Sequence, residues 1–183
     1  NQSHIENLLG RSKDEDLFYC EDPRFEKKLL KIYCVNKIFK EIKQELSLTS
    51  LTNEEYENIK LQNTILDCDI ESIKSKSTLL ELRFDELNAI DWDKGCYMGQ
   101  EITARTKYRG LLKKKIFGVR IQGEIKEKFI FSGNENIGEI LSFNKKLGIA
   151  ILKIKDANHC MNNNNKMKCG EAELTPFIPS WAK

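Results

Sequence analysis

The stretch "KKKIFGVRIQGEIKEKFIFSGNENIGEILSFNKKLGIAILKIK", residues 113–155, decides the fold. It holds four short runs of β-branched and aromatic residues, which glycines and charged residues separate. A further run, "CGEAELTPF" at residues 169–177, comes after the asparagine run "MNNNNKM", which we predict to be a loop tip. Short strands at close spacing, with no long helix among them, predict a small antiparallel sheet closed into a barrel.

The chain ahead of this stretch mixes strands and helices. Residues 17–35, "LFYCEDPRFEKKLLKIYCV", predict two strands joined by a turn at Asp22-Pro23-Arg24. Apolar residues then recur at helical spacing from residue 38 to residue 46, and Thr52 or Asn53 can cap a second helix. We therefore expect an α+β fold with two domains, a partial α+β domain over residues 1–111 and a β-barrel over residues 112–183.

Composition places the chain among ordinary globular proteins. Its 183 residues have a formal net charge of +2 and are 32% charged. Its apolar runs are far shorter than the roughly 20 residues that a membrane helix needs, so we expect no membrane association. The chain begins with Asn1 rather than methionine, so we expect it to be part of something longer.

Cysteine usage favours a reducing compartment, and we predict a cytoplasmic protein. The six cysteines form no Cys-x-x-Cys pair, and a chain of this size does not need disulfides for stability. The two histidines, His4 and His159, lie far apart in the sequence, so zinc-ligand spacing is absent. We expect no structural metal.

Residues 93–110, "DKGCYMGQEITARTKYRG", carry the candidate chemistry. The segment from about Gly99 to Lys107 has few helix breakers, and Gly110 is a plausible terminal glycine. Cys96 would lie at or just before the helix N-terminus, where the partial positive charge of the free amides favours a thiolate, and Lys94 adds to that effect. Taken alone, such a cysteine is more often a packing residue than a nucleophile.

The same residues resemble a family signature. The run Lys-Gly-Cys-Tyr-x-Gly-Gln-Glu of the YgfZ family, folate-binding relatives of the glycine-cleavage T-protein, matches "KGCYMGQE" at residues 94–101 in all seven specified positions. The upstream "ELRFDELNAIDW", the Asp22-Pro23-Arg24 turn and Gly138 with the following "EILS" are similar to further family landmarks. The resemblance covers the chain from about residue 18 to its end.

The resemblance implies a role in making or maintaining iron-sulfur enzymes, including those that methylthiolate transfer RNA. It implies tetrahydrofolate as a ligand, with iron-sulfur proteins or assembly factors as partners. The distinctive chemistry would fall to Cys96, with Lys94 supporting the thiolate and Tyr97 orienting the loop. A bridged complex with a partner, or a transient persulfide, suits a single cysteine better than a resident cluster. The folate contacts that we predict are Glu81 for the pterin edge, Lys60 for the glutamate tail, and Gln100 and Arg105.

The chain also departs from the family pattern. The family carries Gly-Ile-Pro after a helix with an arginine, whereas this chain has Lys60 followed by Thr64-Ile65-Leu66, and Leu79 replaces a common proline. Lysine lacks the planar fork with which arginine grips a carboxylate. The family further begins with a domain ahead of the Asp-Pro-Arg landmark, which contributes one wall of the folate cavity and which we expect to lie outside this chain.

Three classes of function follow from this reading. The first is the folate-linked accessory factor, which we rank above an enzyme. The second is a tetrahydrofolate-dependent aminomethyltransferase, which Cys96-Tyr97-Met98-Gly99 disfavours because the T-protein has a Phe-Ile-Gly type sequence there. The third is an RNA-binding module that uses Lys107, Arg109, Lys113, Lys114 and Lys115. We rank direct nucleic-acid binding last because these cations straddle a helix end and a strand and because stacking aromatic residues are sparse.

Overall fold

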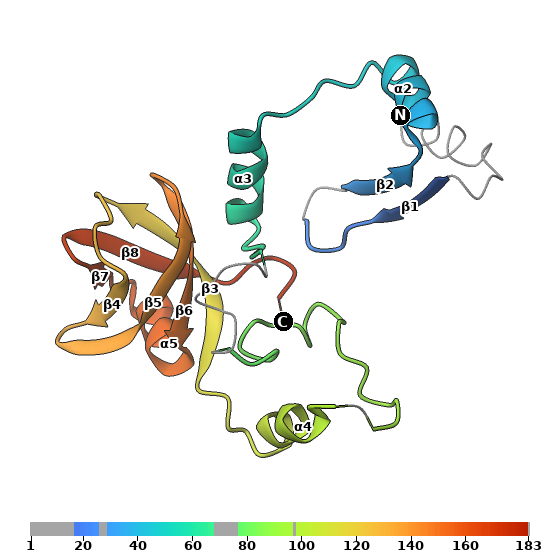
Figure 1. Cartoon of the computed structure of the whole chain (residues 1–183). Helices are drawn as coiled ribbons and strands as arrows, with labels where there is room; N and C mark the ends of the chain where they lie inside the picture. The colour runs from blue at the N-terminus through green and yellow to red at the C-terminus, as the bar shows by residue number, and fades with distance from the viewer. Residues whose placement is uncertain (1–16, 26–28, 68–76, 97, 183) are drawn as a thin grey trace. The chain divides into compact units, whose positions relative to one another are not determined.

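The computed structural model describes residues 17–25, 29–67, 77–96 and 98–182. The chain divides into two compact units, Asn1–Tyr56 and Glu57–Lys183 (Figure 1). The first unit holds a β-hairpin and a helix, and the second holds a barrel with helices and turns around it. The predicted α+β class is therefore confirmed.

The hairpin of the first unit pairs β1 (Leu17–Glu21) with β2 (Leu30–Cys34) in antiparallel register. The Asp22 carboxylate organises the turn, because it accepts hydrogen bonds from Arg24 Nε at 2.8 Å and Nη2 at 2.6 Å, and it pairs with Lys31 at 3.0 Å. The hydrogen bonds from Arg24 are the largest influence on the pKa of Asp22 and, with Lys31, hold it far below its usual range despite burial. The predicted strand–turn–strand is confirmed.

Two helices follow the hairpin, α2 (Asn36–Glu45) and α3 (Asn53–Gln62). Thr52 caps α3: Glu55 N–H donates to its Oγ1 at 3.2 Å, while the Glu55 carboxylate accepts from Thr52 N–H at 2.7 Å. This reciprocal pair is a capping box, which satisfies two free amides at the start of a helix. Both predicted helices, and the cap at Thr52, are confirmed.

Six strands form the closed antiparallel barrel in the order β3-β6-β5-β4-β7-β8. The predicted barrel is thus confirmed, and the structure shows one strand more than the five predicted runs. Its first strand begins at Lys114, although the compact unit that contains it begins at Glu57, and the predicted division into residues 1–111 and 112–183 stays a prediction. The strands are β3 (Lys114–Gln122), β4 (Phe129–Ser132), β5 (Glu135–Phe143), β6 (Leu147–Lys153), β7 (Met167–Cys169) and β8 (Ala172–Phe177).

A short helix that the sequence analysis did not predict lies among the strands, and the prediction that the asparagine run is a loop tip is wrong in part. Helix α5 (Ile154–Asn163) lies between β6 and β7, so part of the asparagine run is helical, and Asn164 ends the helix in the left-handed conformation at φ 57°. The helix packs against β3, β6 and β8 and buries Ala157 and Cys160 in the barrel core. Four apolar residues in ten gave this helix a weak signal, and only burial against the barrel makes it stable.

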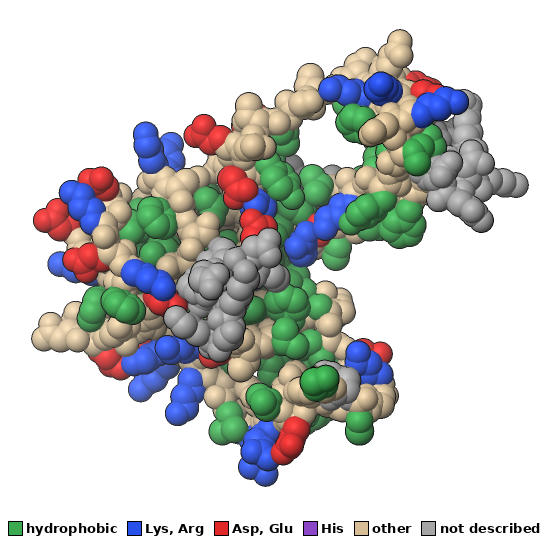
Figure 2. Space-filling view, viewed as in Figure 1, with side chains coloured by type: hydrophobic (Ala, Val, Ile, Leu, Met, Phe, Trp, Pro, Cys, Tyr) green, Lys and Arg blue, Asp and Glu red, His purple; other side chains and the backbone are tan. Residues whose placement is uncertain are grey.

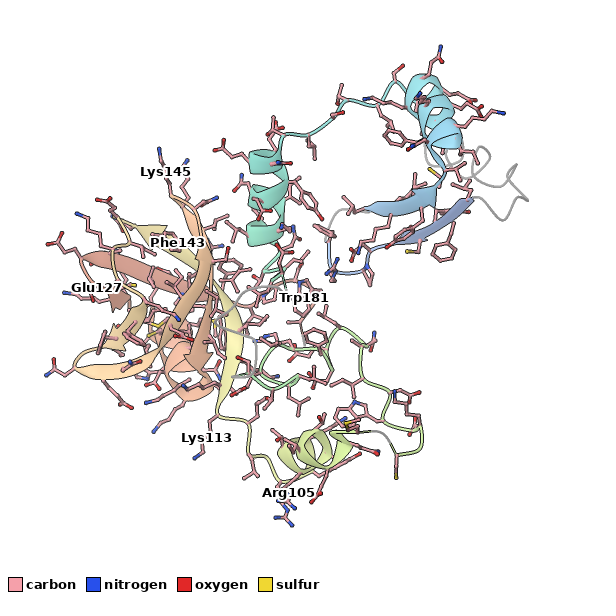
Figure 3. The ribbon with its side chains drawn as sticks, viewed as in Figure 1. Arg105, Lys113, Glu127, Phe143, Lys145 and Trp181 are labelled. Atoms are coloured by element: carbon pink, nitrogen blue, oxygen red, sulfur yellow. The ribbon has the colours of Figure 1, made fainter. Side chains whose placement is uncertain are left out.

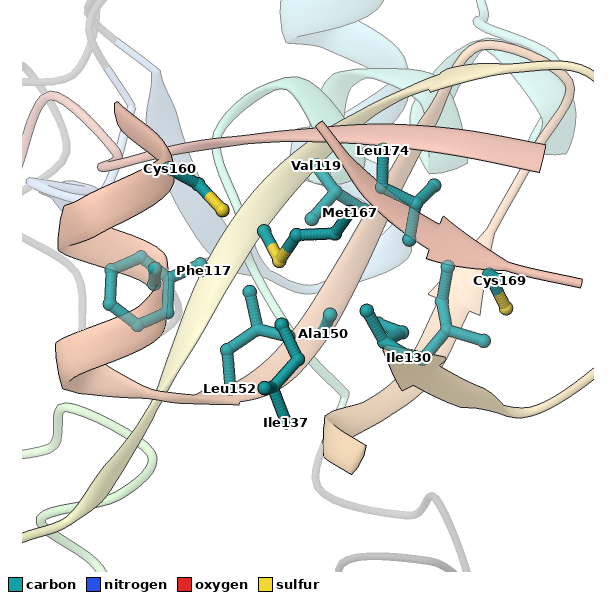
Figure 4. Close-up of a cluster of buried hydrophobic side chains, with 12 residues drawn as sticks. Phe117, Val119, Ile130, Ile137, Ala150, Leu152, Cys160, Met167, Cys169 and Leu174 are labelled. Carbon is teal, nitrogen blue, oxygen red and sulfur yellow. The ribbon is translucent and has the colours of Figure 1, made fainter. Parts of the chain in front are cut away.

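The interior of the barrel is a single apolar cluster (Figure 4). Its members come from alternate positions of the strands, as expected when one face of each strand points inward. Met167 lies among Phe117, Leu152 and Leu174, and Cys160 reaches the same cluster from α5. All of these side chains are at most 1% exposed, which is the packing of a finished core.

Gly138 is required for a close approach between β5 and β6. A Cβ atom at this position would lie 2.0 Å from the Ile151 carbonyl oxygen, which is backbone and cannot move aside. Glycine in a strand often marks such a contact. This packing explains why a glycine stands at the position that the sequence comparison with the family singled out.

The outer face of β3 and β6 is buried by a second cluster in the same unit. Leu61 from α3 and Leu82 pack with Ile116, Ile149 and Ile151, which point away from the barrel interior. The indole of Trp181 ties the carboxy-terminal segment to the end of α3 by donating to the Asn63 carbonyl at 2.7 Å. The α3 end and the segment around Leu82 are thus fixed to the outside of the barrel.

Thr64 closes α3 in a conformation that favours glycine. Its φ is 53°, and the N–H groups of Thr64 and Ile65 donate to the carbonyls of Leu61 and Lys60 at 3.2 and 2.9 Å. These two bonds make a Schellman closure, in which the left-handed residue is usually glycine. Thr64 is 1% exposed, and its Oγ1 has no hydrogen-bond partner in the described structure. Glycine would adopt this conformation without a Cβ atom, so the threonine carries local strain.

We expect Thr64→Gly to be more stable than Thr64→Ala by about 1 kcal/mol, because both remove the buried hydroxyl and only alanine keeps a Cβ atom in the left-handed region. Denaturant unfolding of the full chain measures the difference. The matched pair at Asn158, an exposed position inside α5, should show the reverse order by a similar amount. Alanine above glycine at residue 64 would contradict the strain.

Candidate functional site

The segment that leads into the candidate site is built from two single helical turns. Thr78 and Glu81 form a capping box at the first turn, in which the Glu81 carboxylate accepts from Thr78 N–H at 2.7 Å and from its Oγ1 at 3.2 Å. Arg83 at φ 60° closes the first turn and Asn88 at φ 55° closes the second. The Glu81 carboxylate, a predicted folate contact, is therefore engaged in this local cap.

Arg83 fixes this segment to the barrel. Its side chain is 3% exposed, and its Nε donates to the Ile116 carbonyl at 2.8 Å. The Ile116 N–H donates in turn to the Glu81 carbonyl at 2.9 Å. The N–H and the carbonyl of Ile116 are thus both hydrogen-bonded to this segment. The pairing of β3 with β8 begins two residues later, at Gly118.

The charge of Arg83 is matched by a buried carboxylate. Arg83 Nη1 donates to both oxygens of Glu86, at 2.9 and 2.7 Å, and Lys115 on β3 contacts the same carboxylate. The guanidinium also lies 5.0 Å from the centroid of the Phe117 ring. Burial acts to raise the pKa of Glu86, but the two cations outweigh it and hold that pKa below its ordinary value. The three charged groups form one network between the turns and the barrel.

The loop after this network carries the predicted thiol. Asp91 Oδ1 accepts from the N–H groups of Asp93 and Lys94 at 3.0 and 3.2 Å and shapes the loop. Cys96 is a free, exposed thiol, and Gly99 at φ 87° is the N-cap of α4 (Gln100–Tyr108). Cys96 therefore lies three residues before the N-cap, close to where the helix amides are free. Tyr97 lies outside the described residues.

Helix α4 is held against the loop at its far end. The Lys107 ammonium lies 3.6 Å from the centroid of the Trp92 ring, and Tyr108 meets the same ring edge-on at 6.2 Å. Gly110 ends the helix, as predicted, with its N–H on the Lys107 carbonyl and with φ 60°. The contact between Trp92 and Lys107 joins the residue before the motif to the end of α4. The loop that carries Cys96 therefore starts and ends at segments that contact each other.

The remaining predicted site residues lie in separate local pairings. Lys60 is buried on α3, where its ammonium pairs with Glu57 and Asp67, each at 2.6 Å. Burial acts to lower the pKa of Lys60, but the hydrogen bonds to the two carboxylates raise it above its ordinary value. Arg105 is exposed on α4 and pairs with Glu101 at 2.6 Å. Gln100 is half-buried at the start of α4.

The structure therefore brings together the motif residues Lys94, Cys96, Gln100 and Arg105 on one loop and helix. It places Lys60 and Glu81 on other elements, each held by its own neighbours. The catalytic and folate-binding roles of all these residues stay predictions. In the part of the chain that the structure describes, no group of three His, Cys, Asp or Glu residues is arranged to hold a metal ion.

Sequence reasoning missed three residues that build the site. Arg83 and Glu86 stand at helical spacing in "ELRFDELN", but nothing in that pattern indicates burial. Trp92 precedes the motif directly, and an aromatic residue near a lysine is too common a pattern to predict a contact. Their roles depend on contacts with residues 15 to 33 positions away.

A depression at one end of the barrel lies apart from all the predicted site residues. It measures about 600 Å³ and is lined by residues near the end of β3 and the β5–β6 turn, among them Phe143 and Lys145 (Figure 3). Glu124 is the carboxylate in its lining. This depression is open, and none of the motif residues lines it.

None of the described helices is both long and apolar enough to cross a bilayer.

We expect the Glu86 network to make stability sensitive to acid. Because the folded-state pKa of Glu86 lies below its unfolded value of about 4.3, its contribution is fully present above that pH and is lost as the pH falls through the folded-state value. Glu86→Gln should cost about 3 kcal/mol at neutral pH and should flatten the acid loss. Denaturant unfolding against pH measures both. Glu135→Gln, which breaks an exposed pair, should change little, and an equal effect of the two variants would contradict the network.

We expect Cys96 to be alkylated first among the described cysteines. Burial, with the nearby negative charges of Asp156 and Glu127, raises the pKa of Cys160 and of Cys169, so these thiols should react about tenfold or more slowly in the folded chain. Iodoacetamide labelling at neutral pH, followed by peptide mass spectrometry over time, measures each rate. In denaturant the differences should vanish. A Cys96 thiol that stays unlabelled in the folded protein would contradict its accessibility.

Comparison with known proteins supports the resemblance. Residues 113–183 match the family model described as CAF17, C-terminal beta-barrel domain. The iron-sulfur cluster assembly factor IBA57, mitochondrial, of Homo sapiens is 29% identical over 112 residues, which are 56% of this chain and 30% of that protein. Its homologue in Dictyostelium discoideum is 58% identical over 40 residues, 22% of this chain and 10% of that protein. The IBA57 protein of Saccharomyces cerevisiae is 41% identical over 64 residues, which are 34% of this chain and 13% of that protein.

These matches cover only part of each relative. The chain spans less than a third of the length of the curated relatives it matches. The matched family model covers the barrel, and the motif segment ahead of the barrel bears the family signature. Residues 113–183 thus match the C-terminal β-barrel domain of the CAF17 family, and the chain is similar in part to the IBA57 iron-sulfur cluster assembly factors.

Proposed function

We propose that this chain acts in iron-sulfur cluster assembly and that Cys96 handles the cluster, which is its cargo. The observation that carries the proposal is the free thiol of Cys96, exposed in the "KGCYMGQE" loop just ahead of α4. The names of the relatives supply the class of activity, because they describe iron-sulfur cluster assembly factors. The chain's own residues supply the chemistry.

A single exposed thiol suits a shared cluster. Iron-sulfur clusters are held by several thiolates, and the described residues offer no group of three ligands in one place. Cys96 would therefore contribute one ligand, and a partner protein would contribute the others. Cys96 lies three residues before the N-cap of α4, where a partner protein can reach it.

The surroundings of Cys96 hold it without covering it. Asp91 shapes the loop on one side, and the Lys107–Trp92 contact closes its base on the other. The buried pair of Arg83 and Glu86 fixes the preceding turns to the barrel. A ligand on a rigid support needs little ordering when it binds, which favours transfer between two proteins.

Tetrahydrofolate is proposed only as a ligand, on the strength of the family resemblance. The residues predicted to hold it do not form a folate cleft by themselves, because Lys60 is already paired with Glu57 and Asp67 and Glu81 caps its own turn. No step of the proposed activity is routed through the folate. The link to transfer-RNA modification is likewise proposed, as a consequence of supplying clusters to the enzymes that carry out that reaction.

The place of action is a further open expectation. The cytoplasmic location predicted from cysteine usage stays a prediction, whereas the printed names of the relatives place those proteins in mitochondria.

The full chain can be tested in Saccharomyces cerevisiae cells that lack their own assembly factor of this family. Wild-type chain and Cys34→Ser should restore the activity of an enzyme with a [4Fe–4S] cluster, while Cys96→Ser should lose most of the restored activity because the bridging ligand is gone. An enzyme without a cluster serves as the reference. Full restoration of the enzyme activity by Cys96→Ser, at equal protein levels, would contradict the proposal.

Folate binding has its own test. Titration of the purified chain with tetrahydrofolate, followed by calorimetry, should show saturable binding that Glu81→Gln weakens. Glu171→Gln, a substitution of an exposed carboxylate in the barrel, is the matched control and should bind as wild type does. A flat titration of the wild-type chain would remove folate from the proposal and leave the role of Cys96 standing.

A further inference from the structure

Helix α4 presents its large apolar side chains to solvent. Ile102 is 66% exposed and Tyr108 is 73% exposed, and Met98, just before the helix, is 99% exposed. The buried side of the helix holds Thr103 instead. A helix that packs on its own protein normally shows the opposite arrangement. The outward face of α4 is therefore built for contact with another molecule.

The same region carries a strong positive charge. Residues 98–114 contain five lysines and arginines and a single carboxylate, Glu101, although the whole chain has a net charge of only +2. Arg105 forms an ion pair with Glu101, and the Lys107 ammonium lies over the Trp92 ring. Figure 2 shows blue cationic and green hydrophobic side chains side by side over α4 at the lower edge of the molecule.

Three of these cations have no carboxylate partner. Within the described structure Arg109, Lys113 and Lys114 make no ion pair, and all three are exposed. Lys114 lies opposite Lys153 in the register of β3 and β6, and Lys153 is itself paired with Glu135. A ligand that brings negative charge to this surface would pair with Arg109, Lys113 and Lys114.

We propose that this surface docks an acidic protein segment that carries an apolar anchor residue. The α4 surface comprises Met98, Ile102, Tyr108, Arg109, Lys113 and Lys114. The anchor would cover Met98 and Ile102, and the carboxylates would face Arg109 and the two lysines. The inference rests on the proposed function and deepens it, because the docked protein is the one that supplies the remaining ligands to the cluster at Cys96.

A protein fits this surface better than a nucleic acid. Phosphates would satisfy the cations, but Met98 and Ile102 offer RNA neither a hydrogen bond nor a stacking plane, and Tyr108 is a single aromatic ring. Met, Tyr and Arg are the residue types enriched in protein–protein interfaces. The surface also begins two residues after Cys96, so a protein docked on it would lie beside the thiol.

Part of the surface is restrained before anything binds. Trp92 contacts both Lys107 and Tyr108, and the closure at Gly110 fixes the chain between α4 and β3. The Ile154 N–H donates to the Lys113 carbonyl at 2.9 Å, which ties the start of the cationic strand to α5. A preorganised surface loses little entropy on binding.

The test uses the full chain in cells, with a photo-crosslinking residue in place of Ile102. We expect a crosslinked peptide that is rich in Asp and Glu and contains an apolar residue, identified by mass spectrometry. Changing Arg109, Lys113 and Lys114 together to Glu should reduce the crosslink about fivefold or more. Changing Lys145, Lys146 and Lys168 to Glu reverses the same charge elsewhere on the barrel and should leave it unchanged. The photo-crosslinking residue at Phe129, an exposed apolar position on β4, controls for general stickiness.

Four results would overturn the docking surface: no product, a product with RNA, a product with a second copy of this chain, or a product that the charge reversal at α4 leaves intact. The crosslinked peptide, once synthesised, should bind wild-type chain more weakly as salt rises.

Failure of the docking surface and failure of the proposed function are distinguishable. Cys96→Ser should keep the crosslink and lose enzyme restoration. A charge-reversed chain that restores the enzyme as fully as wild type would remove the docking surface and leave the thiol's role intact.

Discussion

The structure depends on one buried contact, the grip of Arg83 on the first barrel strand. Its guanidinium binds the Ile116 carbonyl, shares the Glu86 carboxylate with Lys115 and lies over the Phe117 ring. Buried charges are tolerated only when they are paired and hydrogen-bonded, so each member of this network makes the others acceptable. The strained backbone of Arg83, at φ 60°, is maintained because these contacts hold it.

That grip explains how a small barrel can support a reactive loop. The turns that hold Arg83 run directly into Asp91, Trp92 and the motif, so the loop starts from a fixed point. The Trp92 contact with Lys107 then fixes the other end. Between the two, Cys96 is exposed, and in the proposed function a second molecule supplies the remaining ligands. The proposed site and docking surface both lie within residues 91–114.

Several helices of this chain end on a left-handed residue that is not glycine. The same left-handed closure ends α2 at Ser47, α3 at Thr64, α4 at Gly110 and α5 at Asn164. Glycine, which suits that conformation, is present only at α4 among these four. At Thr64 the left-handed conformation strains a buried, β-branched residue. Its hydroxyl has no hydrogen-bond partner in the described structure. Burial against the barrel compensates for the strain, because Leu61 and Ile65 on either side are core residues.

The sequence by itself determined the local structure. Alternating apolar residues and glycines predicted the barrel strands, a cap at Thr52 or Asn53 predicted the start of α3, and the motif segment predicted α4 with its end at Gly110. These features depend on residues close together in the chain, where period and capping rules apply. Only the tertiary structure decided that α5 forms and that Arg83 is buried with Glu86 and Lys115. It also decided that Ile102 faces outward and that Lys60 and Glu81 are engaged elsewhere. The physical reason is burial, which depends on which distant segment covers a side chain, and no local pattern of residues carries that information.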